Sequence, residues 1–174
     1  MRSSGILMHI TSLPSPYGVG TLGKAAYDFV NFLAKAEQRY WQILPVGPTG
    51  YGDSPYQTFC TFAGNHYMID LDLLIKDELL EEEEITEISW CENPDKVDYG
   101  TLFENRNKVL KLAFARFDQT EEAYVKFQEE NRRWLDEYAL FMALKSHFGG
   151  KAWGEWPDEI RNHTEAGIIK YQEE

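Results

Sequence analysis

The first 48 residues combine two short apolar runs with one segment of helical period. Residues 5–10 and 40–46 are apolar and are followed by proline-containing turns, a pattern typical of buried strands. Between them, a helix is predicted from Thr21, its expected N-cap, to about Gln38. Its buried face carries Ala26, Phe29, Val30, Leu33 and Ala34. The order strand, helix, strand predicts a right-handed, parallel βαβ unit.

The next segment, residues 49–75, has no helical period but is rich in glycine and aromatic residues. They are Gly50, Gly52, Gly64, Tyr51, Tyr56, Phe59, Phe62 and Tyr67. Long loops without secondary structure are uncommon in compact domains and usually carry function. We therefore expect a functional loop here. Asp70 and Asp72, near its end, are interpreted as solvated caps of a following helix or strand.

Helical patterns dominate the second half of the chain. The acidic run at residues 81–84 indicates a solvated helix end or loop. One helix is predicted from Thr101 onward, and another from Thr120 to Phe148, where two glycines end it. No strand is predicted after residue 75. Because two parallel strands cannot bury both faces of a sheet, either more strands come from elsewhere or the chain is a piece of a larger protein.

Composition and charge exclude several classes of protein. The 174 residues are 43% hydrophobic, which is typical of a globular protein. Lys and Arg number 17 against 29 Asp and Glu, so the net charge is -12 and nucleic acid is not expected as a partner. Most of this charge lies in residues 76–174. Two cysteines, no signal-peptide pattern and no run of about 18 apolar residues lead us to expect a cytoplasmic protein without a membrane segment.

A glycine motif precedes the predicted helix. Gly18, Gly20 and Gly23 match G-x-G-x-x-G, the fingerprint of dinucleotide-binding sites. That fingerprint belongs in the tight turn after a strand, whereas a proline-containing loop intervenes here and no acidic residue ends the second strand. Lys24 extends the match toward a P-loop, but Ala25 stands where a hydroxyl would bind Mg²⁺. Glycines that let the loop turn into a helix explain the motif better than a nucleotide site.

The densest candidate site is the segment Tyr51-Gly52-Asp53-Ser54-Pro55-Tyr56-Gln57. A sugar ring has an apolar face and a rim of hydroxyls, so its site needs an exposed aromatic platform beside short polar groups. The pattern leaves two alternatives open: a sugar-binding loop, or a loop whose tyrosines pack beneath it. No metal site is expected, because the four histidines are far apart and lack the spacing of metal ligands.

Four sequence blocks follow one another in a specific order. They are ILMHITSLPSPYGVGTLG at residues 6–23, WQILPVGPT at 41–49, YGDSPYQ at 51–57 and FAGN at 62–65. Together they closely resemble the N-terminal part of the 4-α-glucanotransferases, the amylomaltases of glycoside hydrolase family 77. The second half, with KAWGEWP at residues 151–157, resembles the helical insertion of this family. The resemblance covers essentially the whole chain.

The resemblance implies an α/β fold, namely the N-terminal portion of a (β/α)8 TIM barrel with strands 1 and 2, helix 1 and a mainly helical insertion. Residues 1–75 would form the start of the catalytic barrel with its Tyr-rich substrate loop, and residues 76–174 the mainly helical insertion subdomain. A complete barrel needs about 250 residues, so the chain is expected to be an N-terminal part. Uncovered barrel strands would favour self-association.

The resemblance also implies an activity, the transfer of α-1,4-glucan segments between maltodextrins by a retaining double displacement, without a cofactor. The catalytic carboxylates of the family lie on later strands and match no residue here, so the chain alone is expected to be inactive. A non-catalytic glucan-binding or interaction module is the alternative.

The site residues that the resemblance implies all bind substrate. Tyr56 resembles the aromatic residue that stacks on the donor-side sugar, and Asp53 and Ser54 shape its loop. Tyr51 resembles a tyrosine of a second glucan groove, with Tyr99 as its expected aromatic neighbour.

Overall fold

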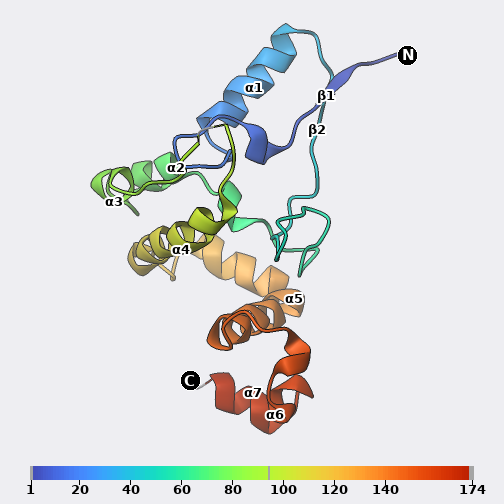
Figure 1. The fold of residues 1–174 in the computed structure, drawn as a ribbon, viewed down its shortest axis with the longest axis vertical. Helices are drawn as coiled ribbons and strands as arrows, with labels where there is room; N and C mark the ends of the chain where they lie inside the picture. The colour runs from blue at the N-terminus through green and yellow to red at the C-terminus, as the bar shows by residue number, and fades with distance from the viewer. Residues whose placement is uncertain (1, 94, 173–174) are drawn as a thin grey trace. The chain divides into compact units, whose positions relative to one another are not determined.

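Two short strands open the chain and pair in parallel (Figure 1). β1 (Gly5–Leu7) and β2 (Tyr40–Gln42) form a two-stranded sheet in which Ile6 lies opposite Trp41. The helix α1 (Lys24–Lys35) connects them. The order strand, helix, strand is therefore confirmed, while the rest of the proposed barrel stays a prediction.

Both strands are shorter than predicted. After Leu7 the chain soon enters the 3-10 helix η1 (Ile10–Ser12), in which Ile10 is buried in a small cluster with Ala26 of α1. The apolar runs predicted buried strands, but within this chain Leu7 is 60% exposed and Tyr40 is 63% exposed. Uncovered strands are what the resemblance to the start of a barrel implied. The apolar runs thus mark the strand positions, and only part of each run is covered within this chain.

The helix α1 differs from the prediction at both ends. Its N-cap is Gly23 rather than Thr21, and it ends at Lys35 rather than near Gln38. The hydroxyl of Thr21 donates instead to the carboxylate of Asp70, which is buried and also caps a second helix. Gly23 makes room for this contact, because a Cβ there would overlap the Asp70 carboxylate. Asp70 is therefore a buried cap and not the solvated one that we expected.

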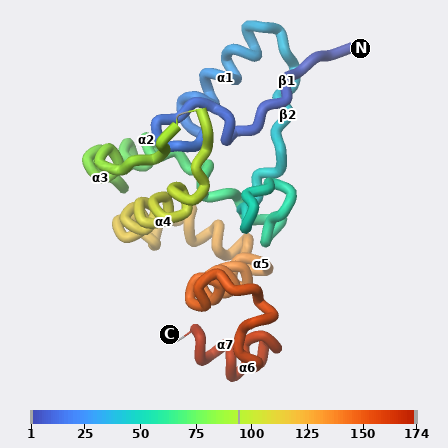
Figure 2. The backbone as a smooth tube through the Cα atoms, viewed as in Figure 1, coloured from blue at the N-terminus to red at the C-terminus, as the bar shows by residue number. Residues whose placement is uncertain are grey.

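An irregular segment runs from β2 to the 3-10 helix η2 (His66–Met68) (Figure 2). An isolated antiparallel bridge pairs Thr49 with Thr58 and closes this segment into a loop. The chain then continues into α2 (Leu71–Lys76).

The core that follows is built by helices. α3 (Glu83–Thr86) and α4 (Tyr99–Arg116) contribute to a cluster around the fully buried Leu71, Ile85 and Leu102. The other buried members are Val19, Tyr67, Leu80, Trp90, Val109 and Ala113. This cluster stabilises the part of the fold that carries the candidate site, since burial of apolar side chains is the main favourable contribution to folding.

The structure, a computed structural model, describes residues 2–93 and 95–172. The chain divides into two compact units, Met1–Phe117 and Asp118–Glu174. The second contains α5 (Glu122–His147), η3 (Trp153–Glu155), α6 (Asp158–Arg161) and α7 (Glu165–Gln172), with a core around Leu144, Trp156 and Ile160. The boundary expected between residues 75 and 76 lies inside the first unit, and the division into a barrel start and an insertion stays a prediction.

Helices without a strand fill the described part of residues 76–174, as the sequence pattern predicted. The end of α5 is also as predicted, because Gly149 and Gly150 follow it with φ values of 63° and 80°. Within the described ranges, no helix is both long enough and apolar enough to cross a membrane.

Candidate functional site

The aromatic loop, residues 49–62, presents its large rings to solvent. Tyr51 is fully exposed, Tyr56 is 71% exposed and Phe62 is 60% exposed. The two tyrosines therefore do not pack beneath the loop, which was one of the two alternatives that the sequence left open. Exposed rings beside short polar groups provide the platform that a sugar ring requires.

A tight turn fixes the first half of the aromatic loop. The backbone N–H of Asp53 donates to the carbonyl of Gly50 at 3.1 Å. Gly52, the third residue of this turn, has a φ of 93°, which glycine adopts without strain. Asp53 itself has a φ of 54°, in the left-handed region where aspartate is among the better tolerated residues. The backbone thus holds Tyr51 at the exposed tip of the turn.

Ser54 shapes the second half of the loop, around Tyr56. Its hydroxyl oxygen accepts the backbone N–H of Tyr56 at 3.4 Å, and its carbonyl accepts the N–H of Gln57 at 3.1 Å. These contacts form a second turn with Tyr56 as its third residue. Ser54 therefore orients the backbone from which the Tyr56 ring projects.

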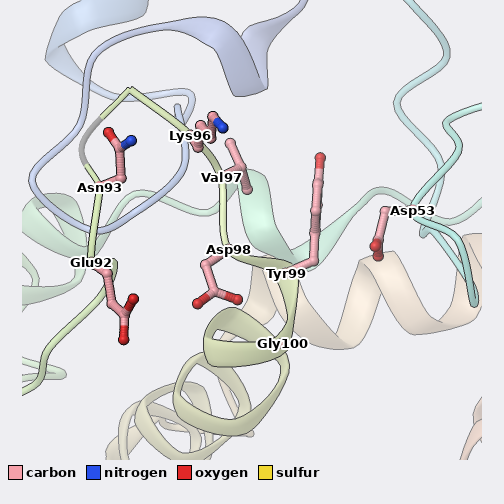
Figure 3. Close-up of a pocket in the computed structure, with 8 residues that line it drawn as sticks. All are labelled: Asp53, Glu92, Asn93, Lys96, Val97, Asp98, Tyr99 and Gly100. Atoms are coloured by element: carbon pink, nitrogen blue, oxygen red, sulfur yellow. The ribbon is translucent and has the colours of Figure 1, made fainter.

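An open pocket with a volume of about 480 Å³ lies where the aromatic loop meets the segment that precedes α4 (Figure 3). It is lined by Asp53, Glu92, Asn93, Lys96, Val97, Asp98, Tyr99 and Gly100. The structure thus brings together Asp53 and Tyr99, two of the five predicted site residues. The other three, Tyr51, Ser54 and Tyr56, are not among the described residues that line it.

Burial sets the protonation behaviour of the two predicted residues in this pocket. The pKa of Asp53, which is half-buried, is raised above its ordinary value by burial. The pKa of Tyr99 is raised first by burial and then by the negative charge of Asp53, while a hydrogen bond with the Thr11 side chain opposes this rise. At neutral pH the Tyr99 hydroxyl is therefore neutral and can both donate and accept hydrogen bonds.

The start of α4 positions Tyr99. Asp98 caps the helix, because its carboxylate accepts the backbone N–H of Thr101 at 3.1 Å and the Thr101 hydroxyl at 2.7 Å. These hydrogen bonds lower the pKa of Asp98, so it carries its negative charge at neutral pH. Asp98 thus gives the pocket a charged wall and fixes the first residue of the helix, which is Tyr99.

The ring of Tyr67 packs against the ring of Tyr99. The two ring centroids lie 6.3 Å apart, with the ring planes at 50°. Tyr67 is buried, and its N–H donates to the Asn65 side chain at 3.0 Å. The N–H of Asn65 in turn donates to the carbonyl of Val46 at 2.7 Å, so the support for Tyr99 is tied to the chain that leaves β2.

Sequence reasoning missed most of the pocket wall. Asp98 could have been found, because aspartate is a common N-cap and this one stands shortly before the predicted helix. Glu92, Asn93 and Lys96 show no comparable pattern. Thr11, which touches Tyr99, lies in a block that was assigned only to the resemblance.

The glycine motif at residues 18–23 has a structural role in this fold. A Cβ at Gly20 would overlap the Ile10 carbonyl oxygen, and one at Gly18 would lie 2.7 Å from the Trp90 carbonyl oxygen. The glycines therefore allow two backbone segments to approach closely, which favours the structural explanation over a nucleotide site. In the described ranges, no group of three or more His, Cys, Asp or Glu side chains could hold a metal ion.

The chain is similar to known proteins over nearly its whole length. A protein family described as 4-alpha-glucanotransferase matches residues 8–174. The 4-alpha-glucanotransferase of Clostridium butyricum is 47% identical over 168 residues, which cover 96% of this chain and 34% of the relative. The enzyme of the same description from Thermus thermophilus is 46% identical over 176 residues, covering 96% of this chain and 33% of the relative.

A solved structure gives the same result for the fold. The amylomaltase from Streptococcus agalactiae in complex with acarbose matches with a TM-score of 0.92 at 44% sequence identity. The match covers 99% of this chain and 35% of that chain. The chain thus spans about a third of the length of the relatives that it matches.

Proposed function

The chain belongs to the 4-alpha-glucanotransferase family of glycoside hydrolase family 77, and on that premise we propose that its aromatic loop binds α-1,4-glucan for segment transfer between maltodextrins. The observation that carries the proposal is the full exposure of Tyr51 and the 71% exposure of Tyr56 on one hydrogen-bonded loop. The acarbose complex of the Streptococcus agalactiae amylomaltase supports a saccharide as the ligand.

The loop and the pocket suit different parts of a glucan. The Tyr56 ring stacks on the apolar face of a sugar ring on the donor side, and Tyr51 stacks on a second stretch of glucan. In the pocket, the oxygens of Asp53 and the Tyr99 hydroxyl form hydrogen bonds with the hydroxyl rim of a sugar. An aromatic platform with a few convergent polar groups is the usual composition of such sites.

The proposed reaction is a retaining double displacement. It needs a nucleophilic carboxylate and an acid/base carboxyl about 5 to 5.5 Å apart. Three carboxylates line the pocket. Asp98 caps α4, Asp53 lies in a tight turn, and Glu92 is exposed to solvent. We therefore place the catalytic carboxylates outside this chain, whose own contribution is to bind and orient the glucan.

The same proposal assigns a different role to each half of the chain. Residues 1–75 supply the start of the catalytic barrel and the aromatic loop, and residues 76–174 supply a mainly helical insertion that carries Tyr99. The exposed Leu7 and Tyr40 on the two strands leave an apolar surface that further barrel strands or a second copy would cover.

Titration of the chain with maltoheptaose by isothermal calorimetry tests the proposed binding. We expect saturable binding that weakens about tenfold in Tyr51→Ala and in Tyr56→Ala, since stacking on an aromatic ring is worth about 1–3 kcal/mol in a related setting. Tyr27→Ala is the matched control, because Tyr27 is 66% exposed on α1, away from the loop. No binding by the folded chain, or equal losses in all three variants, would contradict the proposal.

A further inference from the structure

Arg106 is a buried arginine that donates its hydrogen bonds to backbone carbonyls rather than to an acidic side chain. It lies in the middle of α4 with no exposed surface. Its Nη2 donates to the carbonyl of Tyr67 at 3.2 Å and to the carbonyl of Ile69. Its guanidinium carbon lies 6.0 Å from the centroid of the Trp90 ring, within the range of a cation–π contact. Among the described residues, Nε and Nη1 have no hydrogen-bond partner.

Such a side chain is costly for folding. A buried charge loses its hydration, and two unpartnered donors add to that penalty. Burial lowers the pKa of Arg106 to about 10, with Asp70 acting against the decrease, so the guanidinium still carries its charge at neutral pH. Because replacing a buried ionic group by an apolar one of similar size is often neutral or stabilising, stability alone does not explain an arginine here.

The position of Arg106 on α4 connects it with the pocket. Tyr99 and Arg106 are seven residues apart, close to two helical turns, and so share one face of the helix. Both meet the same residue, since the Tyr99 ring packs against the Tyr67 ring and Arg106 binds the Tyr67 carbonyl. The helix is therefore attached to Tyr67 at two points along one face.

The segment that receives these contacts is fixed on its other side. The Asn65 side chain accepts the N–H of Tyr67, and the Asn65 N–H donates to Val46. The pKa of Tyr67 is raised first by burial and then by Asp53 and Tyr99, while the charge of Arg106 lowers it. A shift of the Tyr67 backbone would thus displace the pocket wall.

We propose that Arg106 is a positioning residue of the glucan pocket. Arg106 holds the Tyr67 backbone in place, and the Tyr67 ring in turn positions Tyr99 against the aromatic loop. Arg106 itself touches no substrate. This inference rests on the proposed function, because it assigns Arg106 to the same binding site. It explains why an arginine stands at a buried position that an apolar residue could fill.

The test compares three variants of the chain with the wild type. Arg106→Met keeps the length of the side chain but removes the donors, and Arg106→Lys restores one charged nitrogen that can donate to both carbonyls, as Nη2 does. Arg116→Met is the matched control, since Arg116 lies on the same helix but binds Leu79 and Glu84. Each variant is examined for its melting temperature, for the nuclear Overhauser contact between the Tyr67 and Tyr99 rings, and for maltoheptaose affinity.

Arg106→Met should lose the ring contact and weaken maltoheptaose binding about tenfold, the size expected when contacting residues are coupled. Arg106→Lys should recover both, and Arg116→Met should change the melting temperature while leaving both as in the wild type. Among variants that fold, affinity should follow the ring contact and not the melting temperature. An affinity that follows only the melting temperature, or a ring contact that persists without the donors, overturns the inference. If the wild-type chain binds no maltoheptaose, the proposed function fails, whereas the ring contact still tests the role of Arg106.

Discussion

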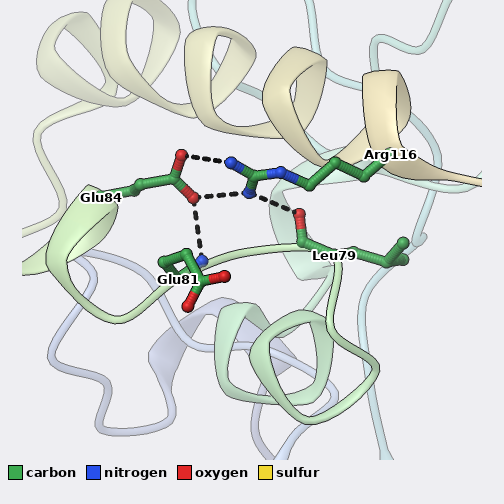
Figure 4. Close-up of polar contacts among 4 residues, drawn as sticks. All are labelled: Leu79, Glu81, Glu84 and Arg116. Carbon is green, nitrogen blue, oxygen red and sulfur yellow. Dashed lines mark hydrogen bonds and ion pairs between the residues drawn. The ribbon is translucent and has the colours of Figure 1, made fainter.

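Arg116 of α4 and Glu84 of α3 form a two-bond ion pair (Figure 4). Both nitrogen-to-oxygen distances are 2.7 Å, and Arg116 also donates to the carbonyl of Leu79 at 3.1 Å. Glu84 in addition accepts the N–H of Glu81 at 2.8 Å. The acidic run at residues 81–84 is therefore more than a solvated loop, because one of its members fastens the end of α4 to the turn before α3.

This ion pair predicts an acid-sensitive component of stability. The hydrogen bonds from Arg116 lower the pKa of Glu84 from 4.5 to about 2 in the folded chain. A depressed carboxyl pKa stabilises the folded state above the unfolded pKa, and this contribution is lost as the pH falls toward the folded value. Melting temperatures measured from pH 6 to pH 2 should show wild type above Glu84→Gln at pH 6, with the difference shrinking below about pH 4.5.

Glu83→Gln, in the same acidic run, serves as the control for the general effect of removing a negative charge. A constant difference between wild type and Glu84→Gln down to pH 2 would contradict the role given to the ion pair.

The glycine motif yields a second prediction. Gly20→Ala should lower the free energy of unfolding by about 1–3 kcal/mol, the usual cost of forcing extra atoms into a packed site. The reason is that the new methyl group would overlap the Ile10 carbonyl oxygen and lie 2.8 Å from the Leu13 nitrogen. Gly64→Ala is the control, since a Cβ there would meet no atom within 4 Å in the described structure. Urea denaturation measures both, and equal stabilities would show that Gly20 is not under steric constraint.

Local patterns predicted much of the fold. The aromatic spacing and the glycine pair located α5 within two residues of its observed bounds, because both features act through neighbours in sequence. Thr21 was assigned as a helix cap by the same local reasoning. That prediction was wrong, because the Thr21 hydroxyl donates to the Asp70 carboxylate instead. A contact between residues so far apart along the chain leaves no periodic trace in the sequence.

The site was predictable to a similar extent. The aromatic loop with Tyr51 and Tyr56 stood out by composition. The resemblance implied Tyr51 as the neighbour of Tyr99, whereas the pocket brings Tyr99 together with Asp53. Arg106 could not be found, because an arginine in a helix is ordinarily exposed. Its partner, the Tyr67 carbonyl, lies far away in the sequence, so no local pattern indicates the contact.

The uncovered strands predict self-association. Leu7 and Tyr40 are exposed, and a two-stranded sheet leaves unpaired backbone groups at its edges. Light scattering over a range of concentrations should show a mass that rises with concentration, and Leu7→Glu should reduce this rise. A monomer at every concentration that binds no hydrophobic dye would mean that the strands are covered from within.

The most direct test of the central claim is a transfer assay with a chimera that carries this chain in place of the matching third of the Clostridium butyricum relative. On maltotriose, the chimera should release glucose and form longer maltodextrins, while the isolated chain should form neither. Tyr56→Ala in the chimera should lower kcat/KM by about 1–3 kcal/mol of transition-state stabilisation, and Tyr56→Phe should lower it less, because the ring supplies the stacking. A folded Tyr56→Ala chimera with unchanged kcat/KM, or transfer by the isolated chain, would contradict the account.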